Sequence, residues 1–446
     1  MENKINFKKI FGNSMWQIGE KIATMLISVV VSAIIARYLG VEQYGLANYV
    51  ISLVSLFATF STLGMEKITI KDIVDKENNE ESILGTSFVI RICGGIILVI
   101  LSQITLYILN GPNKLYQILG AIMGSSMIFK AFEVIEYYLQ SQMKLKVVSI
   151  VRFITAIVVA IAKILVVVFD WGIIGFVATY LVDALVAGIL FYIYYKSKNK
   201  KKWKVDKEYA KKLLHRCWYI AIAGLMTTIY MRIDQVMLGS MLSDTTENGI
   251  YSAAARIAEM WYFVPMAIIA SFQPVIMEKK KEHNENEYIK NMQRLYDMVA
   301  IIGIACGIVI SCFGWIAVDI LYGAEYAKAS SVLAISVWAG LFATLGSARS
   351  VWLVTENLQK YTLIYTGTGA IVNVILNALL IPKIGAFGAA IATLIAQLIA
   401  NVFSLMTFKD TRVSSVMILK SIFNNSTIKD AFIYVINKCK KKGAKE

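Results

Sequence analysis

Histidine, proline and charged residues are scarce in this chain. Its 446 residues include two histidines and four prolines, and only 17% are charged. His215 and His283 lie far apart in basic stretches, so the sequence predicts no His-based metal centre or catalytic triad. There is no GxxxxGK phosphate loop, and residues 367–369 (GTG) lack the third glycine of a dinucleotide motif. We therefore expect no enzymatic activity, no bound metal and no cofactor.

The five cysteines show no pairing pattern. They are scattered along the chain and form no CxxC motif. Free cysteines usually behave as small buried hydrophobes. Packing is therefore the expected role of Cys93, Cys217, Cys306, Cys312 and Cys439.

Apolar residues, in contrast, are abundant. They make up 57% of the chain, against about 45–50% in soluble domains. Uncharged runs such as 44–65 and 384–408 are long enough to cross about 30 Å of hydrocarbon as a helix. The sequence predicts an all-α integral membrane protein with twelve spans, at 14–38, 44–65, 84–109, 115–140, 147–169, 172–195, 215–242, 249–277, 295–321, 329–355, 361–382 and 385–408.

The net charge of +15 is distributed in a way that favours a membrane over nucleic acid. With the N-terminus inside and Arg216 counted with the loop that precedes its span, the predicted cytoplasmic segments hold 33 Lys and Arg residues and the outer loops hold three. This bias predicts that both termini are cytoplasmic. The run 196–204 (KSKNKKKWK) is then an anchor for topology and lipid headgroups. Lys4, Lys8 and Lys9 precede the first apolar region, but its continuation past Ala36 without a small-residue cleavage site favours a retained helix over a signal peptide.

The basic loop 196–214 divides the predicted spans into two sets of six. At equivalent turns of the two sets, GIIG (172–175) precedes FVATYL and GAFG (385–388) precedes AAIATL. Internal repeats are common in transporters, whose substrate site lies between the repeats. We expect an N-terminal lobe (1–195), this loop as a linker, and a C-terminal lobe (215–408), arranged pseudo-symmetrically around a central cavity.

The tail 409–446 is expected to lie on the membrane surface. Apolar residues recur at helical spacing in 416–423 and in 428–436, but charged residues interrupt both stretches. A cytoplasmic amphipathic helix ending in the basic run 440–442 fits this pattern better than a thirteenth span. An arrangement of fourteen membrane helices is the alternative.

Apart from Arg216, nine Lys and Arg residues fall inside the predicted spans. A cation in hydrocarbon costs roughly 3 kcal/mol even on lenient insertion scales, so these residues must face water, acidic partners or one another. The alternative to a substrate-binding role is a structural one, in ion pairs and interhelical hydrogen bonds. We interpret five of them as the substrate-binding cations of the central cavity: Lys21, Lys163, Arg232, Arg256 and Arg349.

Other polar residues are expected to support this cavity or to act as counter-ions. Arg256 and Glu259 are three residues apart and can pair on a helix, as can Lys130 and Glu133. Asp183 lies mid-span, where a counter-ion and a proton or cation site are both open interpretations. The supporting set is Glu20, Lys130, Glu133, Asp183, Asp234, Glu259, Asn373 and Asn377.

Two further arginines and two prolines carry separate expectations. Arg37 and Arg91 lie near span ends, where snorkelling to the interface competes with a place in the cavity. Pro265 and Pro274 both lie in the eighth span, and each removes a backbone hydrogen bond there. We interpret these two prolines as a hinge.

Three stretches resemble a known family. Residues 13–53 (NSMWQIGEKIATMLISVVVSAIIARYLGVEQYGLANYVISL) resemble the opening of the polysaccharide-biosynthesis flippases. These belong to the superfamily that also holds multidrug/toxin extruders and the lipid II flippase. Residues 232–239 (RIDQVMLG) and 248–261 (NGIYSAAARIAEMW) resemble the seventh and eighth helices of the same family. The likeness spans nearly the whole chain in helix count, loop pattern and length.

The resemblance implies transfer of undecaprenyl-pyrophosphate-linked oligosaccharide repeat units across the bacterial cytoplasmic membrane, for O-antigen, capsule or related glycans. It implies alternating access and a cationic cavity. The implied partners are this lipid-linked oligosaccharide and membrane lipids, with no nucleic acid, while polysaccharide polymerase machinery and a coupling ion are left open. The motif positions with chemical content are Arg37, Arg232, Asp234, Arg256 and Glu259, with Lys21 from the first-helix pattern.

One departure from the family pattern lies after the second span. The family often has an arginine there, whereas this chain has Lys67 and Lys71 after Gly64. Lysine offers a point charge instead of a bidentate fork, which puts a phosphate role at this place in doubt.

Two other functions are considered beside the flippase. An ion-coupled multidrug or cationic-solute exporter would have a cavity dominated by carboxylates, such as Glu20, Asp183 and Asp234. A membrane-embedded glycan polymerase or transferase would be expected to carry a long outer loop with catalytic residues. The predicted outer loops are short, and lone intramembrane cations are in excess, so both are disfavoured.

Overall fold

The computed structural model describes residues 7–75, 79–199 and 202–424, with side chains from residue 19 onward. Every regular element in these residues is helical, which confirms the predicted all-α class. The chain forms two compact units. Unit 1 comprises residues up to Ala253 together with Asp319–Tyr326, and unit 2 comprises Ala254–Val318 and the chain from Ala327 onward.

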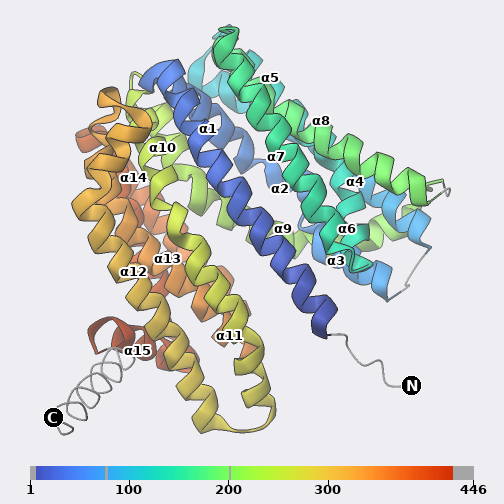
Figure 1. Cartoon of the computed structure of the whole chain (residues 1–446), viewed down its shortest axis with the longest axis vertical. Helices are drawn as coiled ribbons and strands as arrows, with labels where there is room; N and C mark the ends of the chain where they lie inside the picture. Colours follow the sequence, from blue (N-terminus) through green and yellow to red (C-terminus); the bar gives the residue numbers. More distant parts are fainter. Residues whose placement is uncertain (1–6, 76–78, 200–201, 425–446) are drawn as a thin grey trace, which may run out of the picture. The chain divides into compact units, whose positions relative to one another are not determined.

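Unit 1 contains the first ten helical segments and the start of α10 (Figure 1). They are α1 (Phe7–Leu56), α2 (Ala58–Thr62), α3 (Met65–Val74), α4 (Glu80–Asn110), α5 (Lys114–Phe129), the 3₁₀ turn η1 (Lys130–Glu133), α6 (Val134–Ser141), α7 (Leu145–Val168), α8 (Gly172–Lys198), α9 (Lys207–Met241) and α10 (Thr246–Ala258).

Unit 2 follows from the end of α10 (Figure 1). It contains η2 (Met260–Tyr262), α11 (Phe263–Lys281), α12 (Glu285–Tyr322), α13 (Ala329–Thr355), α14 (Lys360–Leu398), the π-helical turn η4 (Ile399–Phe403), η5 (Ser404–Thr407) and α15 (Lys409–Phe423). The last residues of α12 and the turn η3 (Ala324–Tyr326) belong to unit 1.

Nine helices in the described part of the chain are long and apolar enough to cross a membrane, which makes this a multi-pass membrane protein. The sequence predicts twelve spans, and two structural features account for part of the difference. α1 and α14 each contain a non-helical break, at Gly40 and at Ile384–Gly385, close to predicted turns. α9 lies where the seventh span is predicted but is not one of the nine, because polar residues such as Arg232 and Asp234 interrupt its apolar stretch.

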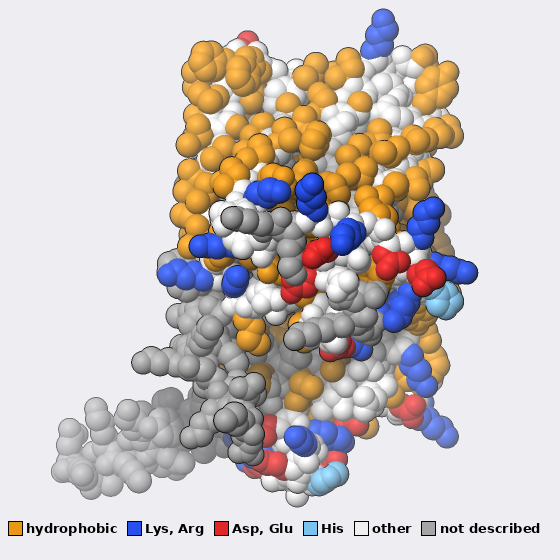
Figure 2. Space-filling view, turned by 90° about the vertical axis from the view of Figure 1, so that its right-hand side faces the viewer, with side chains coloured by type: hydrophobic (Ala, Val, Ile, Leu, Met, Phe, Trp, Pro, Cys, Tyr) orange, Lys and Arg blue, Asp and Glu red, His pale blue; other side chains and the backbone are white. Residues whose placement is uncertain are grey.

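The membrane-facing character of the helices is visible in their exposed side chains. Ile96, Ile100, Ile104 and Ile108 form a stripe along α4, and each is between 46% and 73% exposed. Hydrophobic side chains cover a broad area of the face in Figure 2, and most charged side chains gather beyond its lower edge. Such continuous apolar surface exceeds what soluble monomers expose.

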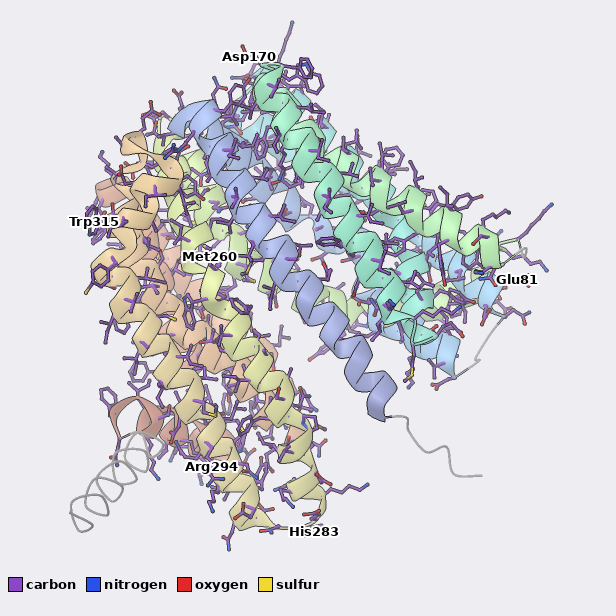
Figure 3. The ribbon with its side chains drawn as sticks, viewed as in Figure 1. Glu81, Asp170, Met260, His283, Arg294 and Trp315 are labelled. Carbon is purple, nitrogen blue, oxygen red and sulfur yellow. The ribbon has the colours of Figure 1, made fainter. Side chains whose placement is uncertain are left out.

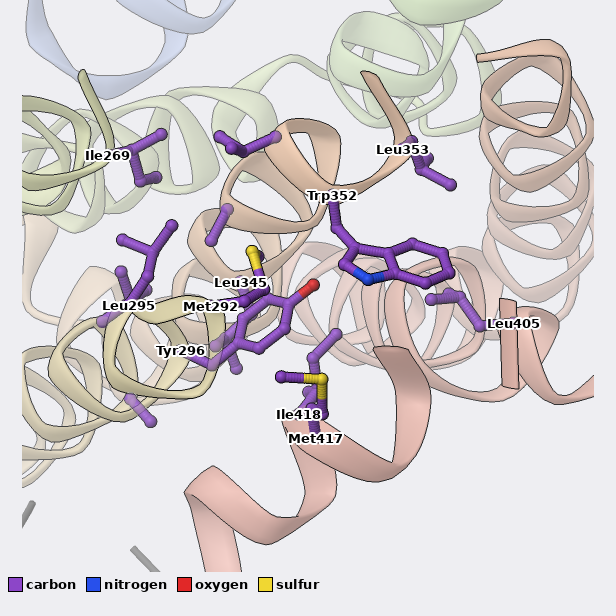
Figure 4. Close-up of a cluster of buried hydrophobic side chains, with 14 of the residues drawn as sticks. Ile269, Met292, Leu295, Tyr296, Leu345, Trp352, Leu353, Leu405, Met417 and Ile418 are labelled. Carbon is purple, nitrogen blue, oxygen red and sulfur yellow. The ribbon is translucent and has the colours of Figure 1, made fainter. Parts of the chain in front are cut away.

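Unit 2 has its own apolar core (Figure 4). Tyr296 of α12 and Trp352 of α13 lie in it together with Met417 and Ile418 of α15. α11 and α12 are joined by a short polar turn near His283 (Figure 3). Burial of these rings and aliphatic chains fixes α12, α13 and α15 against one another.

Pro265 lies beside a local irregularity of the helix. It is the third residue of α11, directly after the 3₁₀ turn η2. The first turn of a helix has no partners for its N–H groups, so the missing donor of Pro265 costs nothing there. The proline ring excludes the carbonyl of the residue four positions earlier, which accounts for the tightened turn at Met260–Tyr262. Pro274 lies inside α11, as expected.

The beginning of the tail is a helix of 15 residues, α15, which is too short to span a membrane. Leu419 and Ile422 pack against the core of unit 2, whereas Val416 and Phe423 are exposed. The predicted stripe 416–423 therefore divides between two faces. The second stripe, 428–436, and the basic run 440–442 lie outside the described residues.

Candidate functional site

The interior of unit 1 contains an ionic network built on the turn η1. Arg91 of α4 is 1% exposed, and its guanidinium donates to the Glu133 carboxylate at 2.9 Å and to the Tyr137 hydroxyl at 2.7 Å. Arg152 of α7 donates to the other Glu133 oxygen at 3.0 Å and to Glu136 at 2.5 Å. Two arginines and two carboxylates from α4, η1, α6 and α7 thus satisfy one another.

The local structure explains why these groups meet. The 3₁₀ turn at Lys130–Glu133 rotates the following residues relative to α5. A shallow depression adjoins the network, and Lys130, Glu133, Arg152 and Asp183 contribute to its lining. The spacing along the sequence predicts that Lys130 can pair with Glu133. In the structure, both carboxylate oxygens of Glu133 accept hydrogen bonds from arginines instead. Arg91 is buried in this network and does not snorkel to the interface.

The ARYLG sequence at the end of the first span joins segments distant in the chain. The Arg37 guanidinium donates to the carbonyl oxygens of residues 319, 320 and 321 at 3.0, 2.7 and 2.9 Å, where α12 is ending. The last carbonyls of a helix lack intrahelical donors, so the arginine caps α12 here, beside the Gly323 N–H, which donates to the Asp319 carbonyl oxygen at 3.0 Å. The Tyr38 hydroxyl donates to the Asp170 carboxylate and accepts from the Gly172 backbone N–H at 2.9 Å. Asp170 marks the turn between α7 and α8 in Figure 3.

The RIDQVMLG stretch presents most of its residues to unit 1. The buried Asp234 accepts a hydrogen bond of 2.6 Å from the Tyr251 hydroxyl. The Ser52 hydroxyl donates to Gln235, and the ring of Tyr49 lies against Gly239. Arg232, in contrast, is exposed and forms no ion pair or hydrogen bond with another described residue. It is therefore the residue of this motif that is available to a ligand.

Glycines allow the first and third family-like stretches to pack closely together. A Cβ on Gly45 would lie 1.9 Å from the Thr245 carbonyl oxygen, and one on Gly249 would lie 2.1 Å from the Val41 carbonyl oxygen. The buried Asn248 donates to the Gly45 carbonyl oxygen at 2.8 Å. α1 and α10 thus pack backbone to backbone, which only glycine permits at these two positions.

Arg349 lies in the interior of unit 2, with 4% of its surface exposed. Its Nη1 donates to the Ala400 carbonyl oxygen at 2.9 Å, and its guanidinium lies 5.1 Å from the centroid of the Tyr365 ring. Ala400 belongs to the π-helical turn η4, where helical hydrogen bonding is irregular. This placement favours a structural role over contact with a substrate.

Asn373 and Asn377 are fully buried in unit 2. The Asn377 amide donates to Asn373 at 3.0 Å, and the Asn373 amide lies 3.4 Å from the Thr393 hydroxyl. Thr393 follows the break at Gly385, so the amides join the two arms of α14. We infer that this pair supports the fold.

The remaining candidate residues differ in exposure. Lys21 of α1 is exposed beside Glu20, whose carboxylate accepts from Thr24 at 3.4 Å. Lys163 of α7 is half-buried, with its ammonium 5.6 and 5.3 Å from the ring centroids of Phe176 and Tyr180. In the predicted eighth span, Arg256 is half-buried and Glu259 is exposed.

The sequence does not predict that four side chains form one connected group: Arg91, Arg152, Glu136 and Tyr137. Arg152 and Glu136 each lie on the polar side of their helix, which is the available signal. Their pairing depends on the turn η1 and on helix packing, and neither follows from spacing along one helix. Among the described residues, no group of three or more His, Cys, Asp and Glu side chains could hold a metal ion.

A family model described as "Polysaccharide biosynthesis protein" matches residues 34–331. The chain is 24% identical over 413 residues to a protein described as probable flippase AglR from Haloferax volcanii. This alignment covers 89% of the chain and 83% of AglR.

Solved structures of two transporter groups have a similar fold. The lipid II flippase MurJ in an inward closed conformation gives a TM-score of 0.70 at 18% identity, over 92% of this chain and 90% of MurJ. An inward-facing multidrug resistance MATE family transporter of the MOP superfamily gives a TM-score of 0.69 at 13% identity, over 91% of this chain and 96% of the transporter. At these identities the likeness concerns the fold.

Proposed function

Because this chain belongs to the polysaccharide biosynthesis protein family, we propose that it is a flippase for undecaprenyl-pyrophosphate-linked oligosaccharide repeat units. It moves them by alternating access from the cytoplasmic to the outer leaflet of the bacterial cytoplasmic membrane, in O-antigen, capsule or exopolysaccharide synthesis. The family and the similarity to AglR support a transporter and not an enzyme. The identity of the transported lipid is what we propose beyond the family.

The observation that carries the proposal is the exposure of Arg232 on α9. A guanidinium inside the predicted seventh span needs water or an anionic ligand. The neighbouring motif side chains of Asp234 and Gln235 point into unit 1 and hold the helix, so Arg232 has a fixed backbone behind it. A planar guanidinium suits bidentate bonding to a pyrophosphate.

Lys21 is the second cation that we assign to the substrate. It is exposed on α1, and α1 packs against α9 within unit 1. Lys163 and Arg256 are half-buried and are proposed as supporting charges. We assign Arg349 a structural role in unit 2, because its guanidinium is occupied by the hydrogen bond to the Ala400 carbonyl oxygen and by the contact with the Tyr365 ring.

Replacing Arg232 by Ala should lower the rate of flipping roughly 10- to 100-fold, because a hydrogen bond to a charged group contributes about 1.5–3 kcal/mol. Proteoliposomes loaded with a fluorescent polyprenyl-pyrophosphate oligosaccharide report flipping through quenching of the outer leaflet. Arg232→Lys keeps the charge without the fork and should retain part of the rate. Lys207→Ala, which removes an exposed cation at the start of the same helix, is the matched control and should have no effect. Equal rates for Arg232→Ala and wild type would refute the role of Arg232.

We propose that α11 bends at Pro274 during transport and that this proline acts as a hinge. Pro265 then fixes the position of the turn η2 that precedes α11. A proline inside a helix leaves a carbonyl without its donor and weakens the helix locally. We expect Pro274→Ala to slow flipping several-fold, with Pro265→Ala having the smaller effect because it occupies the first turn of α11. The same liposome assay measures both variants. An unchanged rate in the double variant would remove the hinge.

An ion-coupled exporter of cationic solutes is the second candidate. The grouping of Glu133 and Glu136 in unit 1 and the MATE-like fold favour it. Both carboxylates are occupied by arginines, however, which leaves little negative charge for a cationic solute. Uptake of a cationic dye by energised vesicles, without flipping of the lipid-linked oligosaccharide, would select this candidate.

A further inference from the structure

The helix α15 is held on unit 2 by its hydroxyl groups. Thr411, Ser414, Ser415 and Ser421 are fully buried. The Tyr365 and Thr411 hydroxyls lie 2.6 Å apart, and those of Tyr296 and Ser414 lie 2.7 Å apart. Small polar groups therefore form much of the inner face of the helix, beside the buried Met417 and Ile418.

Two hydrogen bonds involve backbone carbonyls. The Ser415 hydroxyl donates to the Val402 carbonyl oxygen at 2.9 Å, and the Gln293 amide donates to the Met417 carbonyl oxygen at 3.2 Å. Buried hydrogen bonds of this kind are costly to break. They fix the rotation of α15 about its own axis, and therefore they fix which residues point outward.

The outward face of α15 combines large apolar side chains with cations. Val413, Val416 and Phe423 are 53%, 56% and 83% exposed. Lys409, Arg412 and Lys420 are exposed between them. A helix that faces only water has the opposite arrangement, with apolar residues inside and polar residues outside.

We propose that this face of α15 docks on anionic phospholipid headgroups of the leaflet at which α14 and η5 end. The helix starts two residues after Thr407, the end of η5, so it begins where the last membrane segment leaves the bilayer. Apolar side chains of an interfacial helix enter the headgroup–acyl boundary, and its Lys and Arg residues contact lipid phosphates. The acidic residue of the helix, Asp410, accepts from the Tyr361 hydroxyl at 3.1 Å.

The proposal does not depend on what the protein transports. It concerns a surface of unit 2 and not the residues assigned to the substrate. It predicts that α15 inserts more deeply when the leaflet carries negative charge. Each cation near an anionic surface should change the ratio of docked to undocked α15 about fivefold.

The test uses the full chain with its cysteines replaced and one new cysteine, Val416→Cys, labelled with an environment-sensitive fluorophore. The protein is placed in nanodiscs of phosphatidylcholine, with or without phosphatidylglycerol, and quenching by spin-labelled lipid is measured. Lys281→Cys, an exposed position at the end of α11, is the matched label control. We expect strong quenching at position 416 in the anionic nanodiscs, weakened by added salt, and little quenching at position 281.

The charge variant Lys409→Gln/Arg412→Gln/Lys420→Gln should lose the dependence on phosphatidylglycerol. Its thermal unfolding must match that of the parent, and the single variant Lys420→Gln replaces it if it does not. Quenching at position 416 that is independent of phosphatidylglycerol and salt would overturn the proposal. Quenching no stronger than at position 281 would overturn it as well.

Discussion

Glu133→Gln is expected to lower the free energy of unfolding by about 3–5 kcal/mol, one of the two largest effects that we predict. The substitution keeps the size of the side chain and removes its charge. Arg91, which is 1% exposed, would then lie buried without a carboxylate. A buried cation that loses its partner retains the full cost of its desolvation, whereas the intact pair offsets that cost.

Equilibrium unfolding in mixed micelles with increasing SDS, followed by tryptophan fluorescence, measures this effect. Glu136→Gln is the matched control, because Arg152 is 30% exposed and keeps its bond to Glu133. We expect a loss of about 1 kcal/mol or less in that variant. Arg91→Met/Glu133→Leu should recover most of the stability, since removing both charges leaves none unpaired. A Glu133→Gln protein as stable as the parent would show that water reaches Arg91.

Gly45→Ala and Gly249→Ala should each destabilise unit 1 by about 3 kcal/mol or more, at the upper end of the range for overpacking. The new methyl groups would meet backbone atoms of the facing helix at 1.9 and 2.1 Å, and backbone cannot rotate away as a side chain can. α1 and α10 would have to separate. The hydrogen bond from Asn248 to the Gly45 carbonyl would then be lost.

The same SDS titration measures these glycine variants. Gly367→Ala is the matched control, since no heavy atom lies within 4 Å of a Cβ at this helical position. Its stability should be unchanged or raised, because Ala is the better helix former. Equal stability for Gly45→Ala and Gly367→Ala would mean that α1 and α10 lie farther apart than they do in this structure.

The helical class and the approximate position of most spans could be predicted, because hydropathy depends on local composition. The break at Gly40 falls between the predicted spans 14–38 and 44–65, and its φ of 72° is one that glycine adopts readily. The second of these spans is predicted less well, because α1 ends at Leu56 and α2 occupies Ala58–Thr62. Hydropathy alone does not mark this interruption, since apolar residues continue through it.

The candidate site was less predictable than the fold. Burial of a charge depends on a partner from another helix, as with Arg91 and Glu133, which are 42 residues apart. The sequence identified Arg37 and Asp234 as family positions, but their carbonyl and tyrosine partners assign them to packing. Arg232 differs from these two only in the direction in which it points. Direction follows from packing, and a single sequence does not contain it.

The contacts of Arg37 have a consequence for how the protein is made. Its carbonyl partners lie 282–284 residues later in the chain, and the Tyr326 hydroxyl donates to the Ala36 carbonyl oxygen across a separation of 290 residues. Unit 1 is therefore unfinished while the ribosome is still translating α9 and α11. Its first helices must wait in the bilayer for late-synthesised partners, which makes nascent chains of intermediate length the natural clients of membrane chaperones and proteases.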